Sequence, residues 1–71
     1  MNATQKAAVN SAVKHGFTFC NDSFFKSYRA GKSAISALIT KGYLVAETNE
    51  FGTQYVPTSI ARDFVTYGIE A

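Results

Sequence analysis

The feature that most constrains the fold is an amphipathic segment in the middle of the chain. Four of its residues recur at the i, i+3, i+4, i+7 spacing of one helical face: Ile35, Leu38, Ile39 and Gly42. Lys41 followed by Gly42 is typical of a last helical turn and its stop. We therefore predict a helix that buries this face and ends at Lys41. The other elements must pack against it, because a chain of 71 residues builds only one modest core.

Two starting points are open for this helix. Ser27 can act as its N-cap, which leaves Gly31 inside the helix at a cost of about 1 kcal/mol relative to alanine. Alternatively, Ala30 and Gly31 form a turn, and the helix starts near Lys32. Only the longer helix has Tyr28 and Arg29 in its first turn.

The side of this helix opposite the apolar residues carries cationic and small hydroxyl side chains. Its members are Arg29, Lys32, Ser33, Ser36 and Thr40, and the longer helix adds Tyr28. Such side chains suit contacts with phosphates and with base edges in a groove. These six residues are therefore our predicted nucleic-acid-binding site.

Charge is distributed unevenly along the chain, although the net charge is only +2. Residues 1–42 hold six cations and one acid, Asp22, whereas residues 43–71 hold one cation, Arg62, and four acids. The two parts therefore carry +5 and −3. This asymmetry favours a face prepared for an anionic partner; the alternative is ordinary scatter among few charges.

The N-terminal part predicts a first helix. Thr4 is a candidate N-cap, and the helix runs to about His15 and stops at Gly16. His15 is the single histidine in the chain. We place it in the last helical turn and not in a metal site, because no further ligands stand at a recognisable spacing from it.

Short elements are expected between the two helices. Residues 17–19 alternate apolar and polar side chains as a very short strand does. Asn21 or Asp22 can then cap a brief helix that carries Phe24 and Phe25.

The second part of the chain predicts a β-hairpin followed by a helix. Residues 43–48 and 53–57 are strand-like and flank the turn-rich residues 49–52. Thr58 or Ser59 can cap the closing helix. One core is expected from the apolar faces of all these elements: Val9, Val13, Phe24, Ile35, Leu38, Leu44, Tyr55, Ile60 and Phe64.

The order of these elements resembles the winged helix-turn-helix family over nearly the whole chain. The most specific parts are Leu38 with the following Lys41-Gly42-Tyr43-Leu44-Val45, and Tyr55-Val56-Pro57-Thr58 with the following Ala61. The resemblance implies an α+β domain over residues 1–71, with three helices plus a C-terminal helix packed on a small antiparallel β-hairpin, the wing. It also implies that the helix ending at Lys41 is the recognition helix and that Phe51 lies at the wing tip.

Two functions are open. The family and the polar helix face imply a DNA-binding domain that regulates transcription and binds duplex DNA. A wing with Glu47 and Glu50 and no basic residue would repel phosphates, however. This favours a protein-binding adaptor or inhibitor of the transcription machinery, as in short phage members of the family, with Glu50 and Phe51 as contacts. The contact requires an exposed Phe51, and the alternative is that its ring folds back over Tyr43 or Tyr55.

Catalysis, metal binding and membrane insertion are not predicted. The sequence has no acid–base pair, no Ser/His/Asp set and no glycine-rich phosphate loop, so neither an enzyme nor a cofactor is expected. Cys20 is expected to be a buried free thiol. The N-terminus lacks a secretory h-region and no apolar run can span a bilayer, so we expect a cytoplasmic protein, nucleoid-associated if it binds DNA. Tyr67 and Ile69 lie beyond the core and could serve a homodimer.

Overall fold

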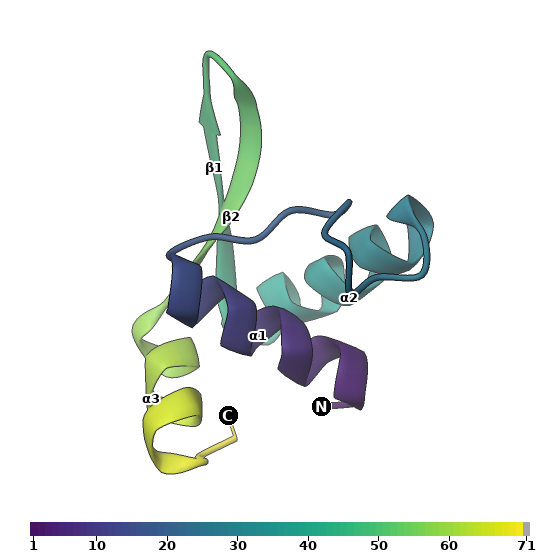
Figure 1. The fold of residues 1–71 in the computed structure, drawn as a ribbon. Coiled ribbons are helices and arrows are strands. Elements are labelled where there is room, and N and C mark those ends of the chain that lie inside the picture. The colour runs from purple at the N-terminus through teal and green to yellow at the C-terminus, as the bar shows by residue number, and fades with distance from the viewer. Residues whose placement is uncertain (71) are drawn as a thin grey trace.

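The computed structural model describes residues 1–70, in which three helices surround the base of a two-stranded antiparallel hairpin (Figure 1). The helices are α1 (Ala3–His15), α2 (Tyr28–Thr40) and α3 (Ser59–Tyr67), and the strands are β1 (Leu44–Asn49) and β2 (Gly52–Pro57). The tip of the hairpin projects away from the helices. The predicted α+β class and the predicted hairpin are therefore confirmed.

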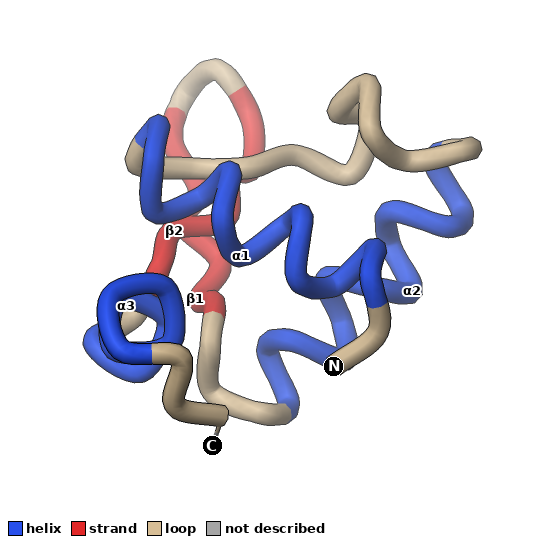
Figure 2. Tube along the Cα trace, turned by 60° about the horizontal axis from the view of Figure 1, so that its bottom comes forward, coloured by secondary structure: helices blue, strands red, loops and turns tan. Residues whose placement is uncertain are grey.

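The predicted number of helices is wrong, because the brief helix carrying Phe24 and Phe25 does not form. Residues 16–27 instead make a loop with turns, which runs from the end of α1 past the hairpin to the start of α2 (Figure 2). Residues 1–70 therefore contain two helices before the hairpin and one after it.

Two sets of hydrogen bonds hold this loop in place. Thr18 pairs with Tyr55 of β2 through an N–H···O bond of 2.8 Å from Thr18 and one of 3.0 Å from Tyr55. The Asp22 carboxylate accepts bonds from the Thr18 hydroxyl at 2.5 Å and from the Phe19 N–H at 3.0 Å. Because this carboxylate bonds to preceding residues, it does not cap a helix that would follow.

α1 begins earlier than predicted. Asn2, and not Thr4, is its N-cap: the Asn2 side chain accepts the Gln5 N–H at 2.8 Å, and the Gln5 side chain accepts the Asn2 N–H at 3.3 Å. This reciprocal capping box satisfies two backbone donors at once, which a cap at Thr4 would not do. The predicted end at His15 and Gly16 is confirmed.

The longer of the two starts predicted for α2 is the observed one. The Ser27 hydroxyl accepts the Ala30 N–H at 3.1 Å, as an N-cap does. Gly31 consequently lies inside the helix, and it is buried. A Cβ atom at this position would lie 2.0 Å from the Cys20 carbonyl oxygen and 2.9 Å from a ring carbon of Phe25. Gly31 thus allows the loop of residues 16–27 to pack directly on the helix.

The end of α2 turns the chain into β1. Gly42 has a φ of 88°, in the left-handed region that glycine enters without a steric penalty. Its N–H donates to the Ile39 carbonyl at 3.0 Å, and the Tyr43 N–H donates to the Leu38 carbonyl at 2.9 Å. This is the hydrogen-bond pattern of a Schellman motif, and the buried Tyr43 and Leu38 side chains provide the apolar contact that accompanies it.

The hairpin has a two-residue turn. Asn49 pairs with Gly52, so Glu50 and Phe51 make the connection. Within residues 1–70, positive φ values occur only at glycines, so neither turn residue has one. Gly52, which follows the turn, has a φ of 125°. Gly52 therefore supplies the left-handed conformation that joins the turn to the twisted strands.

The Thr58 hydroxyl forms hydrogen bonds both to the first turn of α3 and to the end of α2. Of the two predicted caps, Thr58 and Ser59, Thr58 is the observed N-cap of α3, and its hydroxyl accepts the Ala61 N–H at 3.4 Å. The same hydroxyl donates to the Gly42 carbonyl at 2.5 Å. Beyond α3, the Glu70 carboxylate pairs with the α-ammonium group of Met1, which lowers the pKa of Glu70.

Removing the Thr58 hydroxyl should therefore weaken two elements together. We expect Thr58→Ala to lower the free energy of unfolding by about 1–2 kcal/mol, since it removes a helix cap and a bond to a carbonyl. Thr58→Ser should keep most of this stability, and Ser59→Ala, at the exposed neighbouring position, should change little. Urea unfolding measures all three; a Thr58→Ala variant as stable as the wild type would contradict the role of the hydroxyl.

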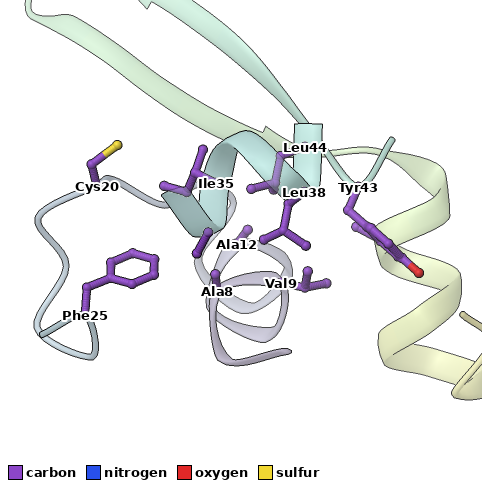
Figure 3. Packing of buried hydrophobic residues seen from close by; sticks show 11 residues of the cluster. Ala8, Val9, Ala12, Cys20, Phe25, Ile35, Leu38, Tyr43 and Leu44 are labelled. Atoms are coloured by element: carbon purple, nitrogen blue, oxygen red, sulfur yellow. The ribbon is translucent and has the colours of Figure 1, made fainter. Parts of the chain in front are cut away.

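One cluster of buried side chains forms the core (Figure 3). Its members are Ala8, Val9, Ala12, Cys20, Phe25, Ala34, Ile35, Leu38, Tyr43, Leu44 and Ala61. Four predicted core residues, Val9, Ile35, Leu38 and Leu44, are thus confirmed, and Val13, Tyr55 and Phe64 pack at its edge.

Two predicted core residues are wrong: Phe24 and Ile60 are 37% and 39% exposed. Phe25 takes the place expected for Phe24, because the loop replaces the helix that would have set its orientation. Tyr43, which was not predicted, is fully buried and meets Phe64 edge to face, with ring centroids 6.0 Å apart.

Candidate nucleic-acid interface

The polar face of α2, which we define as Arg29, Lys32, Ser33, Ser36 and Thr40, is exposed throughout. The opposite side of the helix buries Gly31, Ala34, Ile35 and Leu38. Successive helical residues are rotated by about 100°, so the two sets separate cleanly onto opposite sides. The five residues of the polar face therefore lie together on the surface, as the sequence predicted.

Individual positions on this face differ in what they offer a ligand. The Thr40 hydroxyl donates to the Ser36 carbonyl at 3.1 Å, so its proton is used within the helix. Ser33 borders a hollow of about 290 Å³ that is shared with Asn2 and Thr4 at the start of α1. Arg29, Lys32 and Ser36 make up the remaining part of the face.

Tyr28 lies away from the centre of the polar face. It is one residue before Arg29 and is therefore rotated from it by about 100°. It lines a hollow between the loop and the hairpin, together with Cys20 and Tyr55 among others, and it is 63% exposed. The structure thus brings the other five predicted residues together and places Tyr28 on the flank that faces the hairpin.

Acidic groups are kept apart from the two cations of this face. No carboxylate in residues 1–70 is within ion-pairing distance of Arg29 or Lys32. Asp22, the single acid of residues 1–42, is bonded to Thr18 and Phe19 in the loop. The positive charge of α2 is therefore not neutralised by a neighbouring side chain.

The hairpin carries acid and an exposed aromatic ring. Glu47 accepts a bond from the Gln54 side-chain amide at 3.2 Å, and Glu50 stands in the turn. Phe51 is 91% exposed. Its N–H donates to the Asn49 side chain at 2.9 Å, which orders the turn. Of the two positions open for the Phe51 ring, folding back over Tyr43 or Tyr55 is therefore wrong.

The thiol and phenol groups near the hairpin form a small cluster. Cys20 is a buried free thiol, as predicted. Burial raises the pKa of the Tyr55 hydroxyl, and the neighbouring Cys20 and Tyr28 raise it further. The Tyr55 hydroxyl, like that of any tyrosine at neutral pH, is able to donate a hydrogen bond.

Two other kinds of site are a metal centre and a membrane-spanning helix. Among residues 1–70, no group of three or more histidine, cysteine, aspartate or glutamate side chains is arranged to hold a metal ion. In the same residues, no helix has the length and apolar character needed to cross a membrane.

No protein-family model, curated protein or solved structure matches this chain.

Proposed function

We propose that this chain is a winged-helix DNA-binding domain that contacts duplex DNA through the polar face of α2. The observation that carries the proposal is the pair Arg29 and Lys32, which are exposed, three residues apart on one helical face and free of ion pairs within residues 1–70. An α-helix fits the major groove of B-DNA, where cations meet phosphates and hydroxyls such as that of Ser36 reach base edges. In this role the chain needs no cofactor and catalyses no reaction.

The order of elements supports the winged-helix assignment. α2 leads through its Schellman turn directly into the hairpin, and the hairpin leads into α3. The helix that would precede the recognition helix is replaced by the loop of residues 16–27, which is a departure from the family pattern. This loop still packs on α2 at Gly31 and so fixes the position of the helix on the rest of the domain.

The hairpin has a different role in this proposal from that of a DNA-gripping wing. Glu47 and Glu50 would repel phosphates, and the repulsion would be stronger at low salt. We therefore assign duplex contact to α2 and not to the hairpin tip, Glu50 and Phe51.

A second candidate function is favoured by the exposure of Phe51. A 91% exposed phenylalanine beside a glutamate suits an apolar pocket with a cationic rim on a partner protein, such as a component of the transcription machinery. In that adaptor role Phe51 would be the anchor, and the polar face of α2 would be dispensable.

Duplex binding of paired variants separates the two functions. We expect Arg29→Ala/Lys32→Ala to weaken binding to a random-sequence duplex at low salt on the order of tenfold or more, because two phosphate contacts are lost. The charge-matched control is Lys14→Ala/Arg62→Ala, which removes two exposed cations outside α2. It should weaken binding much less, and Phe51→Ala should leave it nearly unchanged. Fluorescence anisotropy of a labelled duplex gives all four affinities.

Two results would contradict the DNA-binding proposal. One is an equal loss in the control, which would mean that only net charge matters. The other is a loss of duplex binding confined to Phe51→Ala, which would mean that the hairpin tip and not α2 contacts the duplex.

A further inference from the structure

Two adjoining hollows run along the side of the hairpin that faces the loop. The larger has a volume of about 310 Å³ and is lined by Phe19, Cys20, Asn21, Tyr28, Thr53 and Tyr55. The smaller, of about 200 Å³, is lined by Phe19, Asn49, Phe51, Gly52, Thr53 and Gln54. Phe19 and Thr53 line both hollows, so the two are neighbours, and we call the pair the trough; its lining extends from Tyr28 in the first turn of α2 to Phe51 at the hairpin tip.

The walls of the trough are fixed to each other. The loop wall is attached to β2 by the paired backbone bonds between Thr18 and Tyr55. Asp22 holds the turn that carries Phe19 and Asn21. The trough is thus part of the folded domain and is not a gap between independently moving segments.

The lining has the chemistry that recognises flat polar rings. Phe19, Tyr28, Phe51 and Tyr55 supply aromatic surfaces. The amides come from Asn21, from Asn49, whose oxygen already accepts the Phe51 N–H, and from Gln54, whose nitrogen already donates to Glu47. The larger hollow is near the lower limit of small-ligand sites, so each hollow takes one ring system and not a large ligand.

The charge beside the trough is positive where it meets α2. Tyr28 is followed directly by Arg29, and Lys32 is one helical turn further along the same flank. Lys26 precedes α2 in the loop and is also exposed. A ligand with flat polar rings on an anionic backbone matches both the lining of the trough and the positive charge beside it. The end of the trough near Glu50 is less favourable for an anion, because this side chain is negative.

We propose that this trough binds unpaired nucleobases, with the adjoining phosphates held by Arg29 and Lys32. The inference rests on the proposed function and narrows its ligand to a duplex that continues into a single strand. Bases stack on aromatic side chains without regard to sequence, so the trough recognises the unpaired state. An extended peptide is less well matched, because Thr18 already occupies the backbone of β2 at Tyr55.

Three labelled DNA probes test the proposal: a blunt duplex, the same duplex with a five-nucleotide overhang, and a single strand. We expect the wild type to bind the overhang probe about tenfold more tightly than the blunt duplex. Tyr28→Ala/Phe51→Ala should abolish this advantage, so that the overhang probe and the blunt duplex bind with equal affinity. Tyr67→Ala is the control, since it removes an exposed tyrosine from α3. Far-UV circular dichroism establishes that each variant is folded.

A direct readout comes from the ring resonances of Tyr28 and Tyr55 in NMR spectra, which should shift on addition of the overhang probe and not of the blunt duplex. Equal affinity for the two probes in the wild type would overturn the trough proposal while leaving duplex binding by α2 intact. Ring shifts with a tyrosine-rich peptide but not with any oligonucleotide would also overturn it. A different result would contradict the proposal that α2 contacts DNA. In that case Tyr28→Ala/Phe51→Ala would remove binding of the single strand, whereas Arg29→Ala/Lys32→Ala would not weaken it.

Discussion

Replacing Leu38 with alanine should lower the free energy of unfolding by about 2–5 kcal/mol. Leu38 is fully buried on the inner side of α2, where its side chain lies among those of α1 and β1 (Figure 3). Truncation removes its apolar contacts and leaves a cavity that rigid neighbours fill only in part. A domain of 71 residues has roughly 4–11 kcal/mol of stability in total, so this loss is a large fraction of it.

The adjacent residue provides a matched control. Ile39 is 38% exposed whereas Leu38 is fully buried, so we expect Ile39→Ala to cost clearly less than Leu38→Ala, because less apolar surface is removed from the core. Thermal unfolding followed by circular dichroism compares the two variants directly. A Leu38→Ala variant that melts cooperatively near the wild-type temperature would mean that α2 is not the centre of the core.

The second large effect is expected at Gly31, where alanine should destabilise the domain by at least about 2 kcal/mol. Helix propensity alone would raise the free energy of unfolding of this variant, because alanine is favoured over glycine inside a helix by about 1 kcal/mol. The added Cβ would lie 2.0 Å from the Cys20 carbonyl oxygen, however, and this is a backbone atom that no side-chain rotation can move. The loop of residues 16–27 must therefore separate from α2.

Ser33→Ala tests the propensity effect by itself, since Ser33 is exposed in the same helix. It should be neutral or slightly stabilising, whereas Gly31→Ala should show the loss and also more rapid proteolysis within the loop. Urea unfolding of both variants gives the comparison. A Gly31→Ala variant more stable than the wild type would show that the loop does not pack on α2 as described.

Much of the fold could be predicted because its boundaries are set by neighbouring residues. Ser27 caps α2, Gly42 ends it, and Thr58 caps α3 through bonds that span only a few residues. Such local signals do not depend on the rest of the chain. The predicted end of α2, one of its two predicted starts and the predicted hairpin are confirmed for this reason.

The loop of residues 16–27 could not be predicted because its conformation depends on distant contacts. Asp22 is a good helix cap by type, yet its carboxylate bonds to Thr18, which is itself positioned by Tyr55. Once the loop is fixed in this way, Phe25 points into the core and Phe24 does not. The alternation of residues 17–19 predicts a very short strand, of which the bridge between Thr18 and Tyr55 forms, but the sequence separation of these two residues hides the partner from any local pattern.

The candidate site also has one part that could be predicted from the sequence and one part that could not. The polar face of α2 follows from helical periodicity, so five of the six residues of the predicted nucleic-acid-binding site lie together. The trough was missed because Cys20 and Asn21 come from the loop and Thr53 and Tyr55 from β2. The sequence signal that remains is the spacing of aromatic residues at positions 19, 28, 51 and 55, which acquires meaning only after the loop is placed.

The salt dependence of duplex binding tests most directly whether α2 contacts phosphates. Each neutralised phosphate contributes about 0.9 to the slope of log K against log salt concentration. We therefore expect Arg29→Ala/Lys32→Ala to reduce the magnitude of this slope by about two, equally for duplexes of different sequence, and Lys14→Ala/Arg62→Ala to leave it nearly unchanged. A slope that is the same in the wild type and in Arg29→Ala/Lys32→Ala would contradict duplex binding through the polar face of α2.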